Sequence, residues 1–174
     1  MVAVADRRHG RHRPPHRVAR QVGTSQRRSH PSTVRRAHAV PYGVRMTAVG
    51  DPGPFSAHLG FRVVRADGDG AVVEADPGPE HLNGGGILHG GYLSALLDSA
   101  TGWAVHAAGP EGMIAPHVQL NAQFLKAGVA GQPLVCTATC TSVGGRICTT
   151  QGEVTQAGRV IARATGTHAV ISRG

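Results

Sequence analysis

The sequence lacks the long apolar runs, the leader and the cysteine pattern that define several common protein classes. No stretch approaches the ~18 consecutive apolar residues that a membrane-spanning helix needs, so no membrane partner is expected. The N-terminal region has no apolar core of the kind found in secretory signals, which excludes a typical leader of that class. These absences favour a globular protein without a membrane anchor.

Cysteine is scarce, and its three residues are badly placed for a disulfide or a zinc site. Cys136 and Cys140 lie on one face of one predicted strand, about 13 Å apart at 3.3 Å per residue, too far for a bridge. Cys148, on the next strand, could approach either of them. No CxxC or Cys/His ligand spacing occurs. We therefore expect free thiols, a cytoplasmic location, and neither metal nor cofactor.

Positive charge is concentrated at the N-terminus. Residues 1–45 contain eleven of the 18 Lys and Arg residues but one of the 10 acidic residues, Asp6. The remaining seven basic and nine acidic residues give residues 46–174 a net charge of −2. Because residues 1–45 also contain four prolines and no apolar periodicity, they are predicted to be a disordered Arg/His-rich tail.

Three interpretations of this basic tail differ in what they imply. Its Arg and Ser content resembles a mitochondrial transit peptide, but its His and Pro residues are unfavourable for an amphipathic helix. Its arginines suit phosphate contacts, yet Tyr42 is the single aromatic residue for base stacking, so no nucleic-acid partner is expected. The favoured interpretation is an unselected extension or a misassigned start ahead of Met46, with one domain over residues 46–174.

Residues 81–106 contain a glycine-rich loop followed by an amphipathic helix, with the sequence HLNGGGILHGGYLSALLDSATGWAVH. Its apolar positions recur with helical spacing at Leu93, Leu96, Leu97, Ala100 and Ala104. Asp98 lies roughly 140° around the helix from this stripe. Beside it are Gly91, Ser94, Thr101 and Val105. A second, small and polar face with a central carboxylate is therefore predicted.

The start of this helix is suited to bind a carbonyl oxygen. Backbone N–H groups of the first turn have no partner within the helix, and the helix dipole adds partial positive charge. Gly90 and Gly91 have no Cβ, so a ligand atom can approach the backbone closely. A carbonyl bound there would be polarised and an oxyanion stabilised. Glycine-rich helix entries also serve tight packing alone, so the glycines do not by themselves establish a site.

The spacing between Gly90 and Asp98 implies two chains. Eight residues of helix span roughly 12 Å, too far for one carboxylate to reach a carbonyl held at its own helix start. Two antiparallel copies of the helix would bring Asp98 of one subunit to Gly90 of the other. The sequence therefore predicts a twofold dimer with two equivalent sites.

Apolar residues change to a strand-like period of two after the helix. In residues 117–125, Val118, Leu120, Ala122 and Phe124 alternate with His117, Gln119, Asn121 and Gln123. Further strands are predicted over residues 61–66, 71–75, 133–143, 146–155 and 159–171. Tight turns are expected at residues 67–70, 144–145 and 156–158. One long helix with an antiparallel meander indicates an α+β domain, its sheet curled around the helix.

The sequence resembles the PaaI-like branch of the hotdog-fold acyl-CoA thioesterases, in the 4-hydroxybenzoyl-CoA thioesterase superfamily. Three ordered motifs carry the resemblance, namely His81-x-Asn83, Gly86-x-x-His89-Gly90-Gly91 and Ala95-x-x-Asp98-x-Ala100-x-Gly102. The likeness extends over residues 55–170. It implies a hotdog fold, with a curved antiparallel sheet of five to six strands wrapped around a long central helix. It also implies a homo-oligomer, a dimer at least and a tetramer where dimers pair again.

The resemblance implies hydrolysis of an acyl-CoA thioester to a free acid and coenzyme A. Gly90 would polarise the carbonyl, and Asp98 of the partner chain would act as general base or as nucleophile. Asn83 would position the carbonyl or the water, and His89 would shape the helix entry. His117 stands where relatives often carry Ser or Thr, so it would bind water, influence Asp98, or alter the chemistry.

Substrate contacts are also expected from the resemblance. The coenzyme A phosphates should lie near Arg146, with Lys126 and Arg163 as further candidates. Gly91, Tyr92 and Ser94 are expected to contribute to the acyl site. Two other functions remain open at this point, a non-catalytic acyl-CoA-binding module and a hydratase or dehydratase that uses His89 with Asp98.

Overall fold

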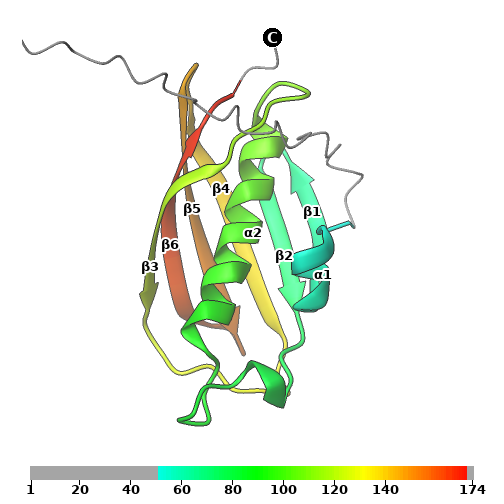
Figure 1. Ribbon diagram of the computed structural model, residues 1–174. Coiled ribbons are helices and arrows are strands. Elements are labelled where there is room, and N and C mark those ends of the chain that lie inside the picture. Colours follow the sequence, from blue (N-terminus) through cyan, green and yellow to red (C-terminus); the bar gives the residue numbers. More distant parts are fainter. Residues whose placement is uncertain (1–50, 172–174) are drawn as a thin grey trace, which may run out of the picture. The chain divides into compact units, whose positions relative to one another are not determined.

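The computed structural model describes residues 51–171, which form one antiparallel sheet curled around a long helix (Figure 1). The strand order across the sheet is β1-β2-β4-β5-β6-β3. The predicted α+β hotdog arrangement is thereby confirmed, with six strands in the sheet. The basic tail predicted over residues 1–45 lies outside the described residues.

All six predicted strands are present, with ends within two residues of those expected. They are β1 (Phe61–Asp67), β2 (Gly70–Ala75), β3 (His117–Phe124), β4 (Leu134–Val143), β5 (Ile147–Gln156) and β6 (Arg159–Ala169). The tight turn between β5 and β6 contains Ala157 and Gly158, both with positive φ, at 49° and 72°. Positive φ at both central residues is the geometry that a two-residue hairpin turn needs.

Helix α2 (Gly90–Ala108) lies against one face of the sheet and forms the centre of the core (Figure 1). The predicted stripe is confirmed, since Leu93, Leu96, Leu97, Ala100 and Ala104 are all at most 2% exposed. Burying a leucine side chain of this kind contributes about 1.5–3 kcal/mol. The last helical residue is Ala108, and the N–H of the C-cap residue Gly109 donates to the Val105 carbonyl.

The buried surface of α2 is wider than the predicted stripe. Thr101 and Val105 were expected beside Asp98 on a second face, but both are fully buried. The reason is the curl of the sheet, because α2 contacts all six strands from β1 to β3. Asp98 remains exposed, so the open face of the helix is narrower than the helical period alone predicts.

Short elements complete the described chain. Helix α1 (Pro54–His58) packs against β1 and α2. A 3-10 turn, η1 (Pro79–His81), precedes the glycine-rich loop. Cys136, Cys140 and Cys148 are free thiols, and burial raises the pKa of Cys136 to about 12. Within residues 51–171 no helix is long and apolar enough to cross a membrane.

Candidate functional site

His89 caps the start of α2. It is the residue immediately before the helix, and its Nδ1 accepts a hydrogen bond of 2.9 Å from the Gly91 N–H. A side chain on Gly91 would lie 2.9 Å from this Nδ1, so the cap requires glycine there. The Gly91 N–H is therefore already used and is not a free donor for a substrate.

Gly90, the residue before Gly91, lines a groove. Its N–H donates to no group among the described residues, as expected for the first residue of a helix. The groove has a volume of about 380 Å³. Its lining includes Asn83, Gly90, Phe124 and Lys126. A Cβ on Gly90 would lie 3.3 Å from the Phe124 ring, so glycine allows this ring to pack closely against the start of the helix.

Asn83 holds the loop through one atom and leaves another available. Its Oδ1 accepts hydrogen bonds from the N–H groups of Gly85, at 2.8 Å, and Ile87, at 3.4 Å. Two N–H donors require the oxygen on that side, so the amide orientation is fixed by the loop. The Nδ2 group has no partner among the described residues and lies at the groove that Asn83 lines.

Asp98 contacts His117 on the open side of α2. Its Oδ1 lies 2.9 Å from His117 Nδ1, and its side chain is 59% exposed while that of His117 is 17% exposed. The other ring nitrogen, His117 Nε2, lies 3.0 Å from the hydroxyl of Thr101. Asp98, His117 and Thr101 thus form a hydrogen-bonded relay. Asp98 and Thr101 lie on α2, and His117 lies on β3.

A β-bulge turns His117 toward the helix. Strict alternation along β3 would place His117 on the same face as Gln119, but the pairing of β3 with β6 shifts register between these residues. The shift turns the imidazole inward and leaves Val118 60% exposed. The sequence pattern contains no glycine or other signal that marks this bulge.

A second histidine lies beneath the first. His168 on β6 is fully buried, and its ring centroid lies 3.8 Å from that of His117. Its Nδ1 donates to the Ala115 carbonyl at 3.1 Å, so its Nε2 accepts from the Thr150 hydroxyl at 3.0 Å. Burial, and then the charge of His117, lowers the pKa of His168. Sequence reasoning missed both Thr101 and His168, because neither belongs to a motif.

The remaining predicted site residues are spread over the domain. Lys126 lines the groove at Gly90, whereas Arg146 lies in the β4–β5 turn at the opposite end of the sheet, where α2 ends (Figure 1). Ser94 is half-buried, one helical turn before Asp98. Tyr92, which is expected to contribute to the acyl site, lies in the first turn of α2. It is 5% exposed and donates from its hydroxyl to the Leu59 carbonyl.

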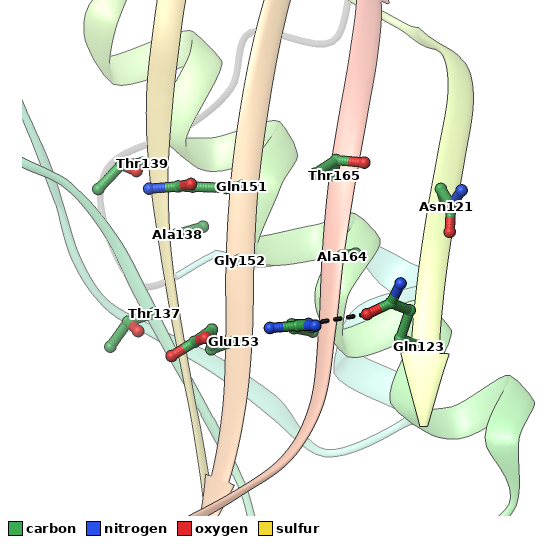
Figure 2. A pocket seen from close by; sticks show the side chains of 11 residues that line it. Asn121, Gln123, Thr137, Ala138, Thr139, Gln151, Gly152, Glu153, Ala164 and Thr165 are labelled. Carbon is green, nitrogen blue, oxygen red and sulfur yellow. Dashed lines mark hydrogen bonds between the residues drawn. The ribbon is translucent and has the colours of Figure 1, made fainter. Parts of the chain in front are cut away.

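A larger hollow of about 600 Å³ lies over the outer ends of polar side chains from β3, β4, β5 and β6 (Figure 2). Arg163 belongs to this hollow, where its Nε donates to Gln123 Oε1 at 2.8 Å. Arg163 lines this hollow and not the groove at Gly90, and the hollow contains none of the residues predicted to act on the thioester.

Comparisons with known proteins give the same family as the motifs. A family model described as "Thioesterase superfamily" matches residues 85–162, which include Gly90, Asp98 and His117. A curated relative from Archaeoglobus fulgidus, named "Putative esterase", is 31% identical over 110 residues, covering 63% of this chain and 70% of the relative.

Solved structures agree in fold and extent. A mutant of the phenylacetic acid degradation protein PaaI from Thermus thermophilus is 31% identical with a TM-score of 0.62, over 67% of this chain and 98% of that chain. A hypothetical thioesterase from Streptococcus pneumoniae, solved with coenzyme A, is 27% identical with a TM-score of 0.63, over 69% and 92%. These matches support thioester hydrolysis as the reaction class. The chain belongs to the thioesterase superfamily, among its PaaI-like hotdog-fold members.

Proposed function

We propose that this protein hydrolyses an acyl-CoA thioester to a free acid and coenzyme A at a site shared by two subunits. One observation carries the proposal. The helix that begins with an unused N–H at Gly90 carries the exposed carboxylate of Asp98 two turns later. The thioesterase named with coenzyme A among the similar structures supports an acyl-CoA ligand.

A dimer is supported by the two surfaces that the described domain leaves open. Eight residues of helix, roughly 12 Å, separate Gly90 from Asp98 in one chain. Strand β3 is at the end of the strand order, and its Val118 and Phe124 are 60% and 53% exposed. Pairing two β3 edges about a twofold axis would set the two α2 helices antiparallel and cover this apolar surface.

The proposed reaction uses both ends of this arrangement. The thioester carbonyl accepts a hydrogen bond from Gly90 of one subunit, and the Asn83 amide assists in holding the carbonyl or the water. Asp98 of the other subunit removes a proton from a water molecule while the oxygen of that water attacks the carbonyl carbon. The oxyanion is stabilised at the helix start, and it collapses with loss of the coenzyme A thiolate, which takes up the proton.

A second route differs only in the nucleophile. Asp98 attacks the carbonyl directly, the thiolate leaves, and water then hydrolyses the resulting anhydride. A single turnover in oxygen-18 water tests the nucleophile route. Water that attacks the aspartyl carbonyl of the anhydride places the label in the Asp98 carboxylate, a result that the general-base route does not give.

We assign the contacts with the coenzyme A phosphates to two basic side chains, one at each end of the domain. Lys126 lies at the Gly90 groove, and Arg146 lies at the opposite end of the sheet. In an antiparallel dimer, Arg146 of the partner chain would approach the Lys126 end. Replacing either residue by alanine is expected to raise KM for acyl-CoA several-fold with little change in kcat, because each contact holds the distant nucleotide.

The hydrogen-bond contacts of His89 and Asp98 favour hydrolysis over hydration. A hydratase based on His89 and Asp98 needs these two side chains to act together on the substrate. The Nδ1 of His89 accepts from Gly91, and Asp98 contacts His117 instead. The second carboxylate oxygen of Asp98 has no partner among the described residues, which suits attack by water or by the carboxylate itself.

The test is thioester hydrolysis by the full chain on a panel of acyl-CoAs, followed with a thiol-trapping dye. Asp98→Asn is expected to lower kcat by at least ~100-fold, the range for loss of a general base or nucleophile. Gly90→Pro removes the N–H while suiting the first position of a helix, and Gly90→Ala is its matched control with the N–H retained. Turnover unchanged by Asp98→Asn would refute the proposal. Acyl-CoA binding without any turnover would instead establish a binding module.

A further inference from the structure

Both ring nitrogens of His117 contact side chains from one turn of α2. Its Nδ1 contacts Asp98 Oδ1 at 2.9 Å, and its Nε2 contacts Thr101 Oγ1 at 3.0 Å. Asp98 and Thr101 are three residues apart on α2 and therefore face the same side of the helix. The β3 bulge places the imidazole between them.

The single hydroxyl proton of Thr101 determines which ring nitrogens of His117 carry hydrogen. That hydroxyl lies 2.7 Å from the Leu97 carbonyl and 3.0 Å from His117 Nε2, and it can donate to one of them. If it donates to Nε2, the neutral ring has its hydrogen on Nδ1. If it donates to Leu97, Nε2 must donate to the hydroxyl, and Nδ1 needs a second hydrogen to face the carboxylate. In both cases an N–H at Nδ1 donates to Asp98.

His168 packs against this ring. The two ring centroids lie 3.8 Å apart with the ring planes tilted by 43°, and both nitrogens of His168 are used by Ala115 and Thr150. The two histidines are also direct cross-strand partners of β3 and β6. The imidazole of His117 is therefore held by Thr101, by His168 and by the strand pairing, with only its Nδ1–H directed at Asp98.

We propose that His117 is a positioning residue, which binds one oxygen of Asp98 and leaves the other oxygen aimed at the carbonyl or water held by the partner subunit. This inference rests on the proposed function. The second oxygen of Asp98 has no partner among the described residues, and the side chain is 59% exposed. His117 thus fixes the direction of the catalytic carboxylate, and it does not itself contact the thioester.

Two amide variants test this role because each retains one of the two ring contacts. Asparagine places its N–H near the position of Nδ1, and glutamine places its N–H near that of Nε2. His117→Asn is expected to keep kcat within about fivefold of the natural protein. His117→Gln is expected to lower kcat about 10- to 100-fold with KM within about twofold, since a misdirected group loses rate and not binding.

A double variant separates positioning from a structural role. If His117 acts through Asp98, adding His117→Gln to Asp98→Asn causes no further loss of kcat. Additive losses, or a His117→Gln enzyme as fast as the natural one, would overturn the inference even while Asp98→Asn remained inactive. An active Asp98→Asn variant would instead overturn the proposed function. Should His117→Gln fail to fold by circular dichroism, Thr101→Val tests the same ring through its other contact, with the same fall in kcat expected.

Discussion

Gly166 on β6 is predicted to be the glycine most sensitive to a single added methyl group near the relay. A Cβ at this position would lie 2.5 Å from the Thr150 hydroxyl and 3.2 Å from Nε2 of both His117 and His168. These neighbours are held by hydrogen bonds, so they cannot move away without breaking them. Glycine is thus required here by the space that two imidazoles occupy.

The expected cost of Gly166→Ala follows from two opposing effects. Overpacking a buried site costs about 1–3 kcal/mol, whereas replacing glycine by alanine recovers about 0.4–1 kcal/mol by restricting the unfolded chain. The middle values of these two ranges leave a net loss of unfolding free energy of about 1.3 kcal/mol. With a urea m-value of about 2 kcal/mol/M, the unfolding midpoint falls by about 0.7 M.

Urea unfolding at one fixed protein concentration measures this loss, since an oligomer's stability depends on concentration. The matched control is Gly145→Ala, because a Cβ on Gly145 meets nothing within 4 Å. That control should be neutral or slightly stabilising. Thr150→Ala removes the nearest atom, so the double variant should be less destabilised than the sum of the single variants by at least about 0.5 kcal/mol. Equal midpoints for Gly166→Ala and Gly145→Ala would refute the packing argument.

Three further variants address the core, the cap and the buried histidine. Leu97→Ala, at a fully buried position, should lower the free energy of unfolding by about 2–5 kcal/mol, measured by urea unfolding; a loss below about 1 kcal/mol would contradict its place in the core. His89→Ala should cost about 0.5–2 kcal/mol by loss of the cap on Gly91, and His89→Asn should retain most of that stability. The pKa of His168 is lowered from 6.5 by burial, so the unfolded chain binds its proton first on acidification. Its contribution to stability is complete above pH 6.5 and is lost as the pH falls toward the folded pKa, by at most about 1.4 kcal/mol per pH unit. Urea midpoints at a series of pH values should therefore decline less steeply in acid for His168→Gln than for the natural protein, and identical slopes would contradict this.

Periodicity and turn chemistry were sufficient to predict the elements of this fold. The stripe from Leu93 to Ala104 fixed which side of α2 is buried, and the change to a period of two located β3 through β6. Both signals are local, because they depend on which side chains face the core of a single element. The free N–H of Gly90 also follows from local rules for helix starts, whereas the role of His89 at the helix entry was predicted from the family resemblance.

Features that depend on how the sheet curls could not be read from local patterns. Thr101 is buried because β3 closes around the helix, and His117 turns inward because of an unmarked bulge. His168 joins them from a strand fifty residues further along, through the register of β3 with β6. The hydrogen bond from the Tyr92 hydroxyl to the Leu59 carbonyl likewise joins residues that no local pattern connects.

The central claim is that each active site combines Gly90 of one subunit with Asp98 of the other, and mixed dimers test it most directly. Asp98→Asn and Gly90→Pro chains, each inactive alone, are co-expressed and allowed to pair at random. In a mixed dimer one site carries both substitutions and the other carries neither. About half of the dimers are mixed with one intact site of two, so hydrolysis should return to about a quarter of the natural rate. No recovery in purified mixed dimers would contradict the shared site.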